Sequence, residues 1–164
     1  SLTDSQSWVV RPALALAAGA ADLRAIEAAR GAGQVCDLGA GWIALAEVPA
    51  AVVAARRLNG AVTCISAAPF YGLATIGETS GAHVAVPRRR GLRPVPALTR
   101  VHRETHWTRP SAMPPVAPIA EVLSRVLRCQ PARSAIVTVD SAPNKELVTA
   151  DEVVVDTGTQ STAG

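Results

Sequence analysis

The sequence predicts an α+β protein, in which an N-terminal helical region with a hairpin precedes a small mixed α/β domain. Its 164 residues are enough for one medium domain or two small ones. The chain is 49% hydrophobic but only 3% aromatic, so Ala, Val, Leu and Ile must fill most of its core. Helical and strand periodicities alternate along the chain, and glycine and proline separate them.

Residues 1–47 predict two helices and a hairpin. Pro12 suits the first turn of one helix, and Asp22 lies near the start of the next. Short strands on either side of Gly39-Ala40-Gly41 predict a hairpin, whose glycines can adopt a positive φ. Two helices followed by a hairpin are the plan of a winged helix-turn-helix domain.

Residues 48–155 predict the α/β domain. In chain order, the predicted elements are a helix over 50–60, a buried strand over 61–65, a short helix over 66–73, a strand over 83–87, a strand over 99–107 that pairs with it, and helices over 115–131 and 132–148. Ser66 is the expected N-cap of the short helix, and Pro143 interrupts the last helix. Residues 156–164 lack apolar side chains and predict a disordered tail.

The net charge of +3 is unevenly distributed. Residues 88–109 contain seven arginines and one acidic residue, Glu104, which gives this segment a charge of +6. All three histidines, His83, His102 and His106, lie in the segment or just before it. Such a local excess indicates a polyanion or an acidic protein surface as partner. The alternative is a solvated hairpin loop that keeps an apolar protein in solution.

Cysteine usage and hydropathy predict a cytoplasmic protein. Cys36, Cys64 and Cys129 are odd in number, widely spaced and set in apolar stretches, which predicts buried, reduced thiols. No window approaches the roughly 18 apolar residues of a membrane span. Residues 11–21 are predicted to form a helix and not a signal peptide, because no basic cluster precedes them.

A family resemblance covers residues 8–153. It rests on short motifs in a fixed order: GWIAL at 41–45, SAAPFYGL at 66–73, HVAVPR at 83–88, VHR at 101–103 and DSAPNKELVT at 140–149. In these motifs the chain resembles actinobacterial proteins related to the AbiEi-type antitoxins of type IV toxin–antitoxin systems. The resemblance implies a winged helix that binds operator DNA and represses its own operon. It also implies a C-terminal domain that helps to neutralise a nucleotidyltransferase-type toxin.

Two positions depart from the family pattern. Relatives usually carry basic residues along the second helix, whereas here Arg24 and Arg30 are offset by nearby acidic residues. Pro143 stands where relatives tend to have leucine. Some relatives continue into a Vsr-like endonuclease domain, and nuclease activity is not carried over to this chain.

Seven residues are the predicted DNA contacts. Long polar side chains reach phosphates and base edges, whereas alanine reaches neither. On the second helix and before the hairpin, the residues that can do so are Arg24, Arg30 and Gln34. In the arginine-rich loop they are Arg88, Arg89, Arg90 and Arg93, and an acidic toxin surface is the alternative partner for this loop.

No enzyme, metal site or cofactor is predicted. His102 and His106 would share one face of a helix, but in a strand about 13 Å separates them. Ser66, His83 and Asp140 supply the residue types of a catalytic triad without the sequence pattern of a nucleophile elbow. His83 is expected to be a hydrogen-bonded edge residue, and Asp140 to form a buried salt bridge or a cap.

These observations together predict a cytoplasmic, non-enzymatic DNA-binding repressor and antitoxin of AbiEi type. Its expected partners are double-stranded operator DNA, a cognate toxin and a second copy of the chain, because dimers match palindromic operators. The alternatives are a protein-interaction module with a degenerate winged helix that does not bind DNA, and the regulatory part of a truncated Vsr-like nuclease.

Overall fold

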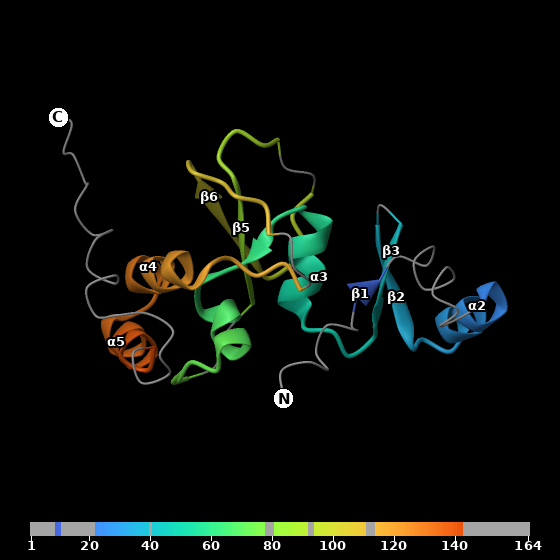
Figure 1. Cartoon of the computed structure of the whole chain (residues 1–164), viewed down its shortest axis with the longest axis horizontal. Coiled ribbons are helices and arrows are strands. Elements are labelled where there is room, and N and C mark those ends of the chain that lie inside the picture. The colour runs from blue at the N-terminus through green and yellow to red at the C-terminus, as the bar shows by residue number, and fades with distance from the viewer. Residues whose placement is uncertain are drawn as a thin grey trace.

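Two three-stranded sheets and the helices around them make up the computed structural model (Figure 1). It describes residues 9–10, 22–39, 41–77, 81–91, 94–110 and 114–142. The predicted helix at Pro12, Arg93, the effect of Pro143 and the C-terminal tail lie outside these residues. The α+β class predicted from the sequence is confirmed.

The N-terminal sheet is antiparallel and has the strand order β1-β3-β2. Helix α2 (Leu23–Gly31) begins as predicted, because the side chain of its N-cap Asp22 accepts a hydrogen bond from the Ala25 N–H at 2.7 Å. The predicted hairpin follows it as β2 (Val35–Gly39) and β3 (Trp42–Leu45), and β1 (Val9–Val10) pairs with the other side of β3. In Figure 1 this sheet and α2 lie at one end of the molecule.

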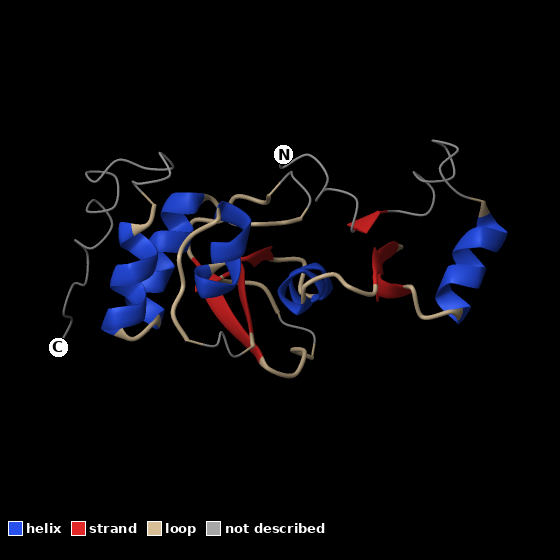
Figure 2. Ribbon diagram, turned by 90° about the horizontal axis from the view of Figure 1, so that it is seen from below, coloured by secondary structure: helices blue, strands red, loops and turns tan. Residues whose placement is uncertain are grey.

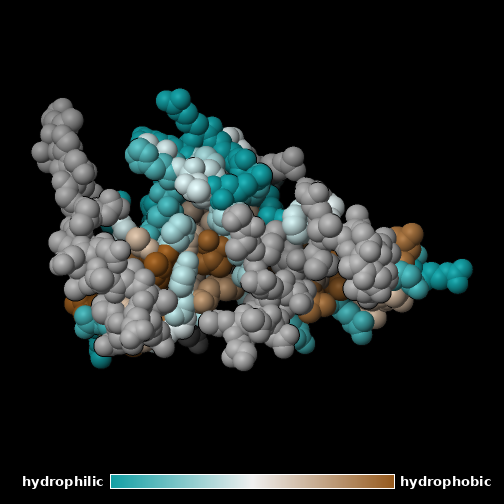
Figure 3. Space-filling view, in the orientation of Figure 1, coloured by the Kyte–Doolittle hydropathy of each residue, from teal (hydrophilic) through white to brown (hydrophobic). Residues whose placement is uncertain are grey.

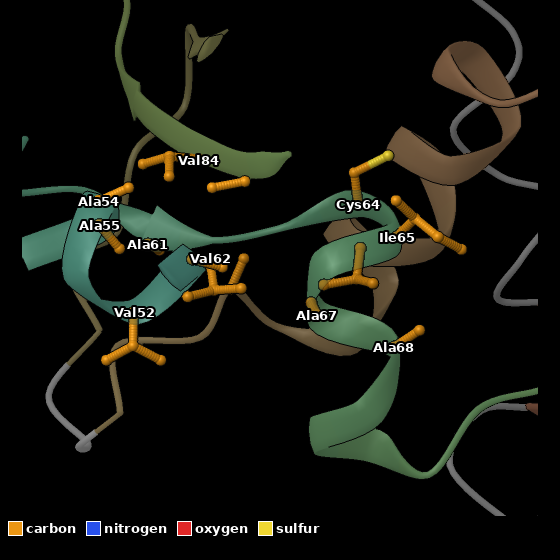
Figure 4. Close-up of a cluster of buried hydrophobic side chains, with 14 of the residues drawn as sticks. Val52, Ala54, Ala55, Ala61, Val62, Cys64, Ile65, Ala67, Ala68 and Val84 are labelled. Atoms are coloured by element: carbon orange, nitrogen blue, oxygen red, sulfur yellow. The ribbon is translucent and has the colours of Figure 1, made fainter. Parts of the chain in front are cut away.

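Helix α3 (Ala50–Arg57) connects the two sheets in the place of the helix predicted over 50–60, and Pro49 precedes it. Its buried residues, Ala51, Val52, Ala54 and Ala55, pack against the second sheet (Figure 4). Leu38 and Ala44 of the hairpin belong to the same buried cluster as these residues. Small side chains allow this helix to approach the strands closely, as the alanine-rich composition predicts.

The second sheet has the order β4-β5-β6 (Ala61–Val62, Ala82–Pro87 and Thr99–Glu104). Strands β5 and β6 pair as predicted, but they run parallel, with Ala85 opposite His102. The arginine-rich loop is therefore a crossover between parallel strands. The prediction of a hairpin loop at this place is wrong. The expectation that His83 is an edge residue is also wrong, because β5 is the central strand of the sheet.

The predicted strand over residues 61–65 is shorter than expected. Strand β4 ends at Val62, because Cys64 has a positive φ of 53° that turns the chain out of the sheet. A 3-10 helix, η2 (Cys64–Tyr71), begins at once, so Ser66 lies inside it and is not its N-cap. The Ser66 Oγ instead accepts a hydrogen bond from the His83 N–H at 3.0 Å.

Helices α4 (Ile119–Cys129) and α5 (Ala132–Asp140) complete the domain and lie together at the other end of the molecule (Figure 2). The helix predicted over 115–131 is present as α4, and its apolar stripe, Val122, Leu123 and Val126, is buried. Ile119 and Leu127 pack against the same core. Together α4 and the 3-10 helix cover one side of the second sheet.

Replacing Gly60 with alanine is expected to destabilise the fold by roughly 2 kcal/mol, as overpacking of a core does. A Cβ atom at Gly60 would lie 2.3 Å from the carbonyl oxygen of Ala85 and 2.9 Å from Cγ1 of Val84. Urea unfolding of the variant measures this effect. Gly91→Ala is the matched control, because its Cβ would meet no atom within 4 Å. An unchanged stability of Gly60→Ala would contradict the close approach of Gly60 to β5.

Candidate functional site

Arginine side chains gather around the loop that joins β5 to β6. We call the exposed residues Arg88, Arg89, Arg100, Arg103 and Arg109 the arginine surface. Figure 3 shows hydrophilic residues concentrated at this side of the molecule. The only acidic residue of the segment, Glu104, forms an ion pair with Arg125 of α4, so it does not neutralise the surface.

Part of this arginine-rich segment stabilises the loop itself. The Arg103 guanidinium donates to the carbonyl oxygens of Arg88 and Arg90 at 2.8 and 3.1 Å. Arg90 donates to the carbonyl oxygen of Asn59, just after α3, at 2.5 Å. Of the predicted DNA contacts in this loop, Arg90 therefore has a structural role, whereas Arg88 and Arg89 are exposed. Arg88 and Arg89 form no side-chain hydrogen bond or ion pair with any described residue.

A hollow of about 610 Å³ lies at the carboxyl ends of β5 and β6. Its lining residues are Pro87, Arg88, Arg89, Glu104, Thr105 and Trp107. Arg88 and Arg89 thus border a concave surface, and an anionic group that entered it would meet two guanidinium groups.

The DNA contacts predicted in the N-terminal region are all exposed, but one of them already has an ion-pair partner. Arg24 and Gln34 are exposed on α2 and just before β2. Arg30 forms an ion pair with Asp37 of β2 at 2.9 Å, and both side chains keep solvent access. This pair fixes α2 against the hairpin and reduces the charge that Arg30 presents to a ligand.

Trp42 connects the hairpin to the rest of the chain. The guanidinium carbon of Arg56 lies 3.8 Å from the centroid of the Trp42 ring, within the range of a cation–π contact. Trp42 also packs against the main buried cluster. Trp42 is therefore a packing residue that joins the hairpin to the core.

A second group of residues lies inside the α/β domain. We call Cys64, His83, His102 and Cys129 the Cys/His cluster. Each comes from a different element: Cys64 is the first residue of η2, His83 and His102 lie on β5 and β6, and Cys129 is the last residue of α4. The parallel register places the two histidines on the same face of the sheet, because side chains alternate along a strand.

The four side chains converge within a few ångströms. The distance between His83 Nδ1 and His102 Nε2 is 3.1 Å, and that between Cys129 Sγ and His83 Nδ1 is 3.6 Å. One potential ligand atom from each residue lies within 4.8 Å of the other three. Gln130 Nε2 lies 3.6 Å from Cys64 Sγ and 3.5 Å from Cys129 Sγ, so it can donate a hydrogen bond to either sulfur.

Burial controls the ionisation of this cluster. It is the main cause that lowers the pKa of His102 to about 4, and the charge of His83 adds to it. Burial also lowers the pKa of His83, with a smaller contribution from Arg100. Both imidazoles are therefore neutral at pH 7, which is the form that binds metal ions.

The Cys64 thiol is not activated for nucleophilic chemistry by this environment. Burial raises the pKa of the Cys64 thiol to about 12, and the neighbouring Cys129 contributes in the same direction. A thiol protonated at neutral pH is a poor nucleophile.

The residues considered from the sequence for catalysis do not come together as a triad. The hydrogen bond from His83 to Ser66 involves the backbone N–H of His83 and not its imidazole, which lies against His102 and Cys129 instead. Asp140 is exposed at the end of α5, so the expectation that it is buried is wrong. His106 lies beyond the end of β6 and is exposed.

Only part of the Cys/His cluster could be recognised in the sequence. The sequence suggests His102 as a metal ligand only in combination with His106. The four cluster residues are spread over more than sixty residues with no metal-binding spacing. All three histidines lie in the predicted strands 83–87 and 99–107, so their positions in the sequence do not single out the two that belong to the cluster.

Comparison of the chain with models of known protein families gives no match, and a search of curated protein sequences also finds none. Within the described ranges, no helix has the length and apolar character needed to cross a membrane.

Proposed function

We propose that the chain is a non-enzymatic, DNA-binding regulator of AbiEi type that represses its own operon and binds a cognate toxin. The observation that carries this proposal is the arginine surface. Arg88 and Arg89 project from a loop that other arginines hold in place, and no described acidic side chain pairs with them. Rigidly presented guanidinium groups suit the phosphate oxygens of DNA.

The N-terminal region supports the same proposal. A helix that leads directly into an antiparallel hairpin, with a further strand on the far side of β3, is the arrangement expected of a winged helix-turn-helix domain. Helix α2 would then be the helix that lies in the major groove. Arg24 on this helix and Gln34 just before β2 are predicted to contact the DNA there. Arg88 and Arg89 would bind the phosphate backbone.

Two observations favour a second candidate function, a protein-interaction module that does not bind DNA. The ion pair between Arg30 and Asp37 occupies one of the few basic side chains near α2. Leu23 on the same helix is 63% exposed, and such a side chain suits a protein partner better than a phosphate. In this case the arginine surface would face an acidic toxin surface.

Fluorescence anisotropy with DNA from upstream of the gene, at two salt concentrations, distinguishes these functions. We expect the chain to bind this duplex more tightly than a scrambled one. Arg88→Ala combined with Arg89→Ala should reduce the slope of log K against log salt by about two, since each phosphate contact contributes roughly 0.9.

The matched control is Arg128→Ala combined with Arg133→Ala, which removes the same charge from exposed positions on α4 and α5. We expect this control to keep the slope of the unmodified chain. Equal and weak binding to both duplexes would contradict DNA recognition and favour the interaction module.

A further inference from the structure

We propose that Cys64, His83, His102 and Cys129 bind one zinc ion in a closed, structural site. The proposal rests on the Cys/His cluster alone and is independent of DNA binding. Two thiols and two imidazoles form the donor set, and within the described residues no other group of this kind comes together. Tetrahedral sites with two sulfur and two nitrogen ligands are typical of zinc.

The distances in the cluster match those of a zinc site. With zinc–nitrogen bonds of about 2.0 Å and zinc–sulfur bonds of about 2.3 Å, tetrahedral geometry separates two nitrogens by about 3.3 Å and a nitrogen from a sulfur by about 3.5 Å. The corresponding distances are 3.1 Å between the histidine nitrogens and 3.6 Å between Cys129 and His83. Since no pair exceeds 4.8 Å, only small side-chain movements are needed to bind the ion.

The surroundings also fit a metal site. Gln130 lies within hydrogen-bond distance of both sulfurs, and hydrogen bonds from a second shell of residues stabilise metal-bound thiolates. The backbone of Cys64 has a φ of 53°, which is an unfavourable conformation for a residue other than glycine. This conformation points the Cys64 sulfur toward α4, where Cys129 lies (Figure 4).

The four side chains can all act as ligands of one cation. Cys64 and His83 are buried, and His102 and Cys129 are half-buried beside them. A bound divalent cation displaces the thiol proton and forms favourable bonds with both imidazoles. Because all four ligands come from the protein, the site has no open position for substrate, so its role is structural.

Cobalt substitution tests the proposal on the full chain, purified without metal and kept reduced. We expect one Co²⁺ per chain, with the strong visible absorption of tetrahedral cobalt and a thiolate-to-cobalt charge-transfer band. Zinc should displace the cobalt and abolish both signals. The cobalt spectrum of the unmodified chain reports the ligands directly, so this test does not depend on how variants fold.

Variants then identify the ligands. Cys129→Ser and His102→Ala should each lower the zinc affinity by more than the 10- to 100-fold loss that is typical when a residue hydrogen-bonded to a ligand is replaced. The matched controls, Cys36→Ser and His106→Ala, remove the same residue types outside the cluster and should leave the affinity unchanged. The proposal is overturned if the reduced chain binds no cobalt, if the spectrum is octahedral, or if Cys36→Ser abolishes binding.

Discussion

Saturation of the Cys/His cluster with zinc is expected to raise the free energy of unfolding by about 4 kcal/mol. This value applies when free zinc is about 1,000 times its dissociation constant, because a ligand that binds only the folded state stabilises it by RT ln(1 + [L]/Kd). For a chain of this length the melting temperature should rise by roughly 8 to 16 °C. Differential scanning calorimetry of the metal-free chain, with and without zinc, measures the shift.

Magnesium is the control ion, because it prefers oxygen ligands and should produce no shift. The Cys129→Ser variant provides the control chain and should no longer respond to zinc. An equal shift in this variant would show that zinc stabilises the fold from another position.

Breaking the ion pair between Glu104 of β6 and Arg125 of α4 is expected to cost about 3 kcal/mol. The two side chains keep only 13% and 17% of their exposure, so either charge would remain largely buried after losing this ion-pair partner. The expected cost is at the lower end of the range for buried pairs, because neither side chain is completely enclosed. Urea unfolding, followed by tryptophan fluorescence, measures the loss in Glu104→Leu and in Arg125→Met.

The double variant, Glu104→Leu with Arg125→Met, tests whether the loss comes from an unpaired charge. We expect it to be more stable than either single variant, because apolar side chains can replace a buried pair at little cost. A double variant as unstable as the sum of the single variants would mean that the two residues act independently.

Local patterns in the sequence predict most of the helices. Capping by Asp22, the proline before α3 and the apolar stripe of α4 are properties of neighbouring residues, so they are visible in the chain itself. The hairpin between β2 and β3 is likewise fixed by its turn. Each of these elements appears where the sequence predicts it.

The predictions from the sequence are wrong or incomplete where long-range packing determines the structure. Periodicity identifies the strands 83–87 and 99–107, but it does not distinguish a parallel from an antiparallel pair. The end of β4 depends on the positive φ of Cys64, which apolar neighbours conceal in the sequence. The Cys/His cluster requires both features, so it could not be assembled from the sequence.

The arginine surface was only partly predictable for a related reason. The excess of positive charge in residues 88–109 is evident from the sequence. Which arginines stabilise the loop and which remain exposed depends on where α3 ends, because Arg90 donates to the carbonyl oxygen of Asn59. The sequence therefore predicts the patch but not the separate roles of Arg88 and Arg90.

The order of the four cluster residues along the chain has a consequence for biosynthesis. Ribosomes release a chain from its N-terminus, so Cys64, His83 and His102 emerge before Cys129, the last residue of α4. A nascent chain that lacks Cys129 offers three of the four ligands and leaves one coordination position to water. Zinc would consequently be captured tightly only after α4 has been synthesised, when only α5 of this domain's described elements is still to follow.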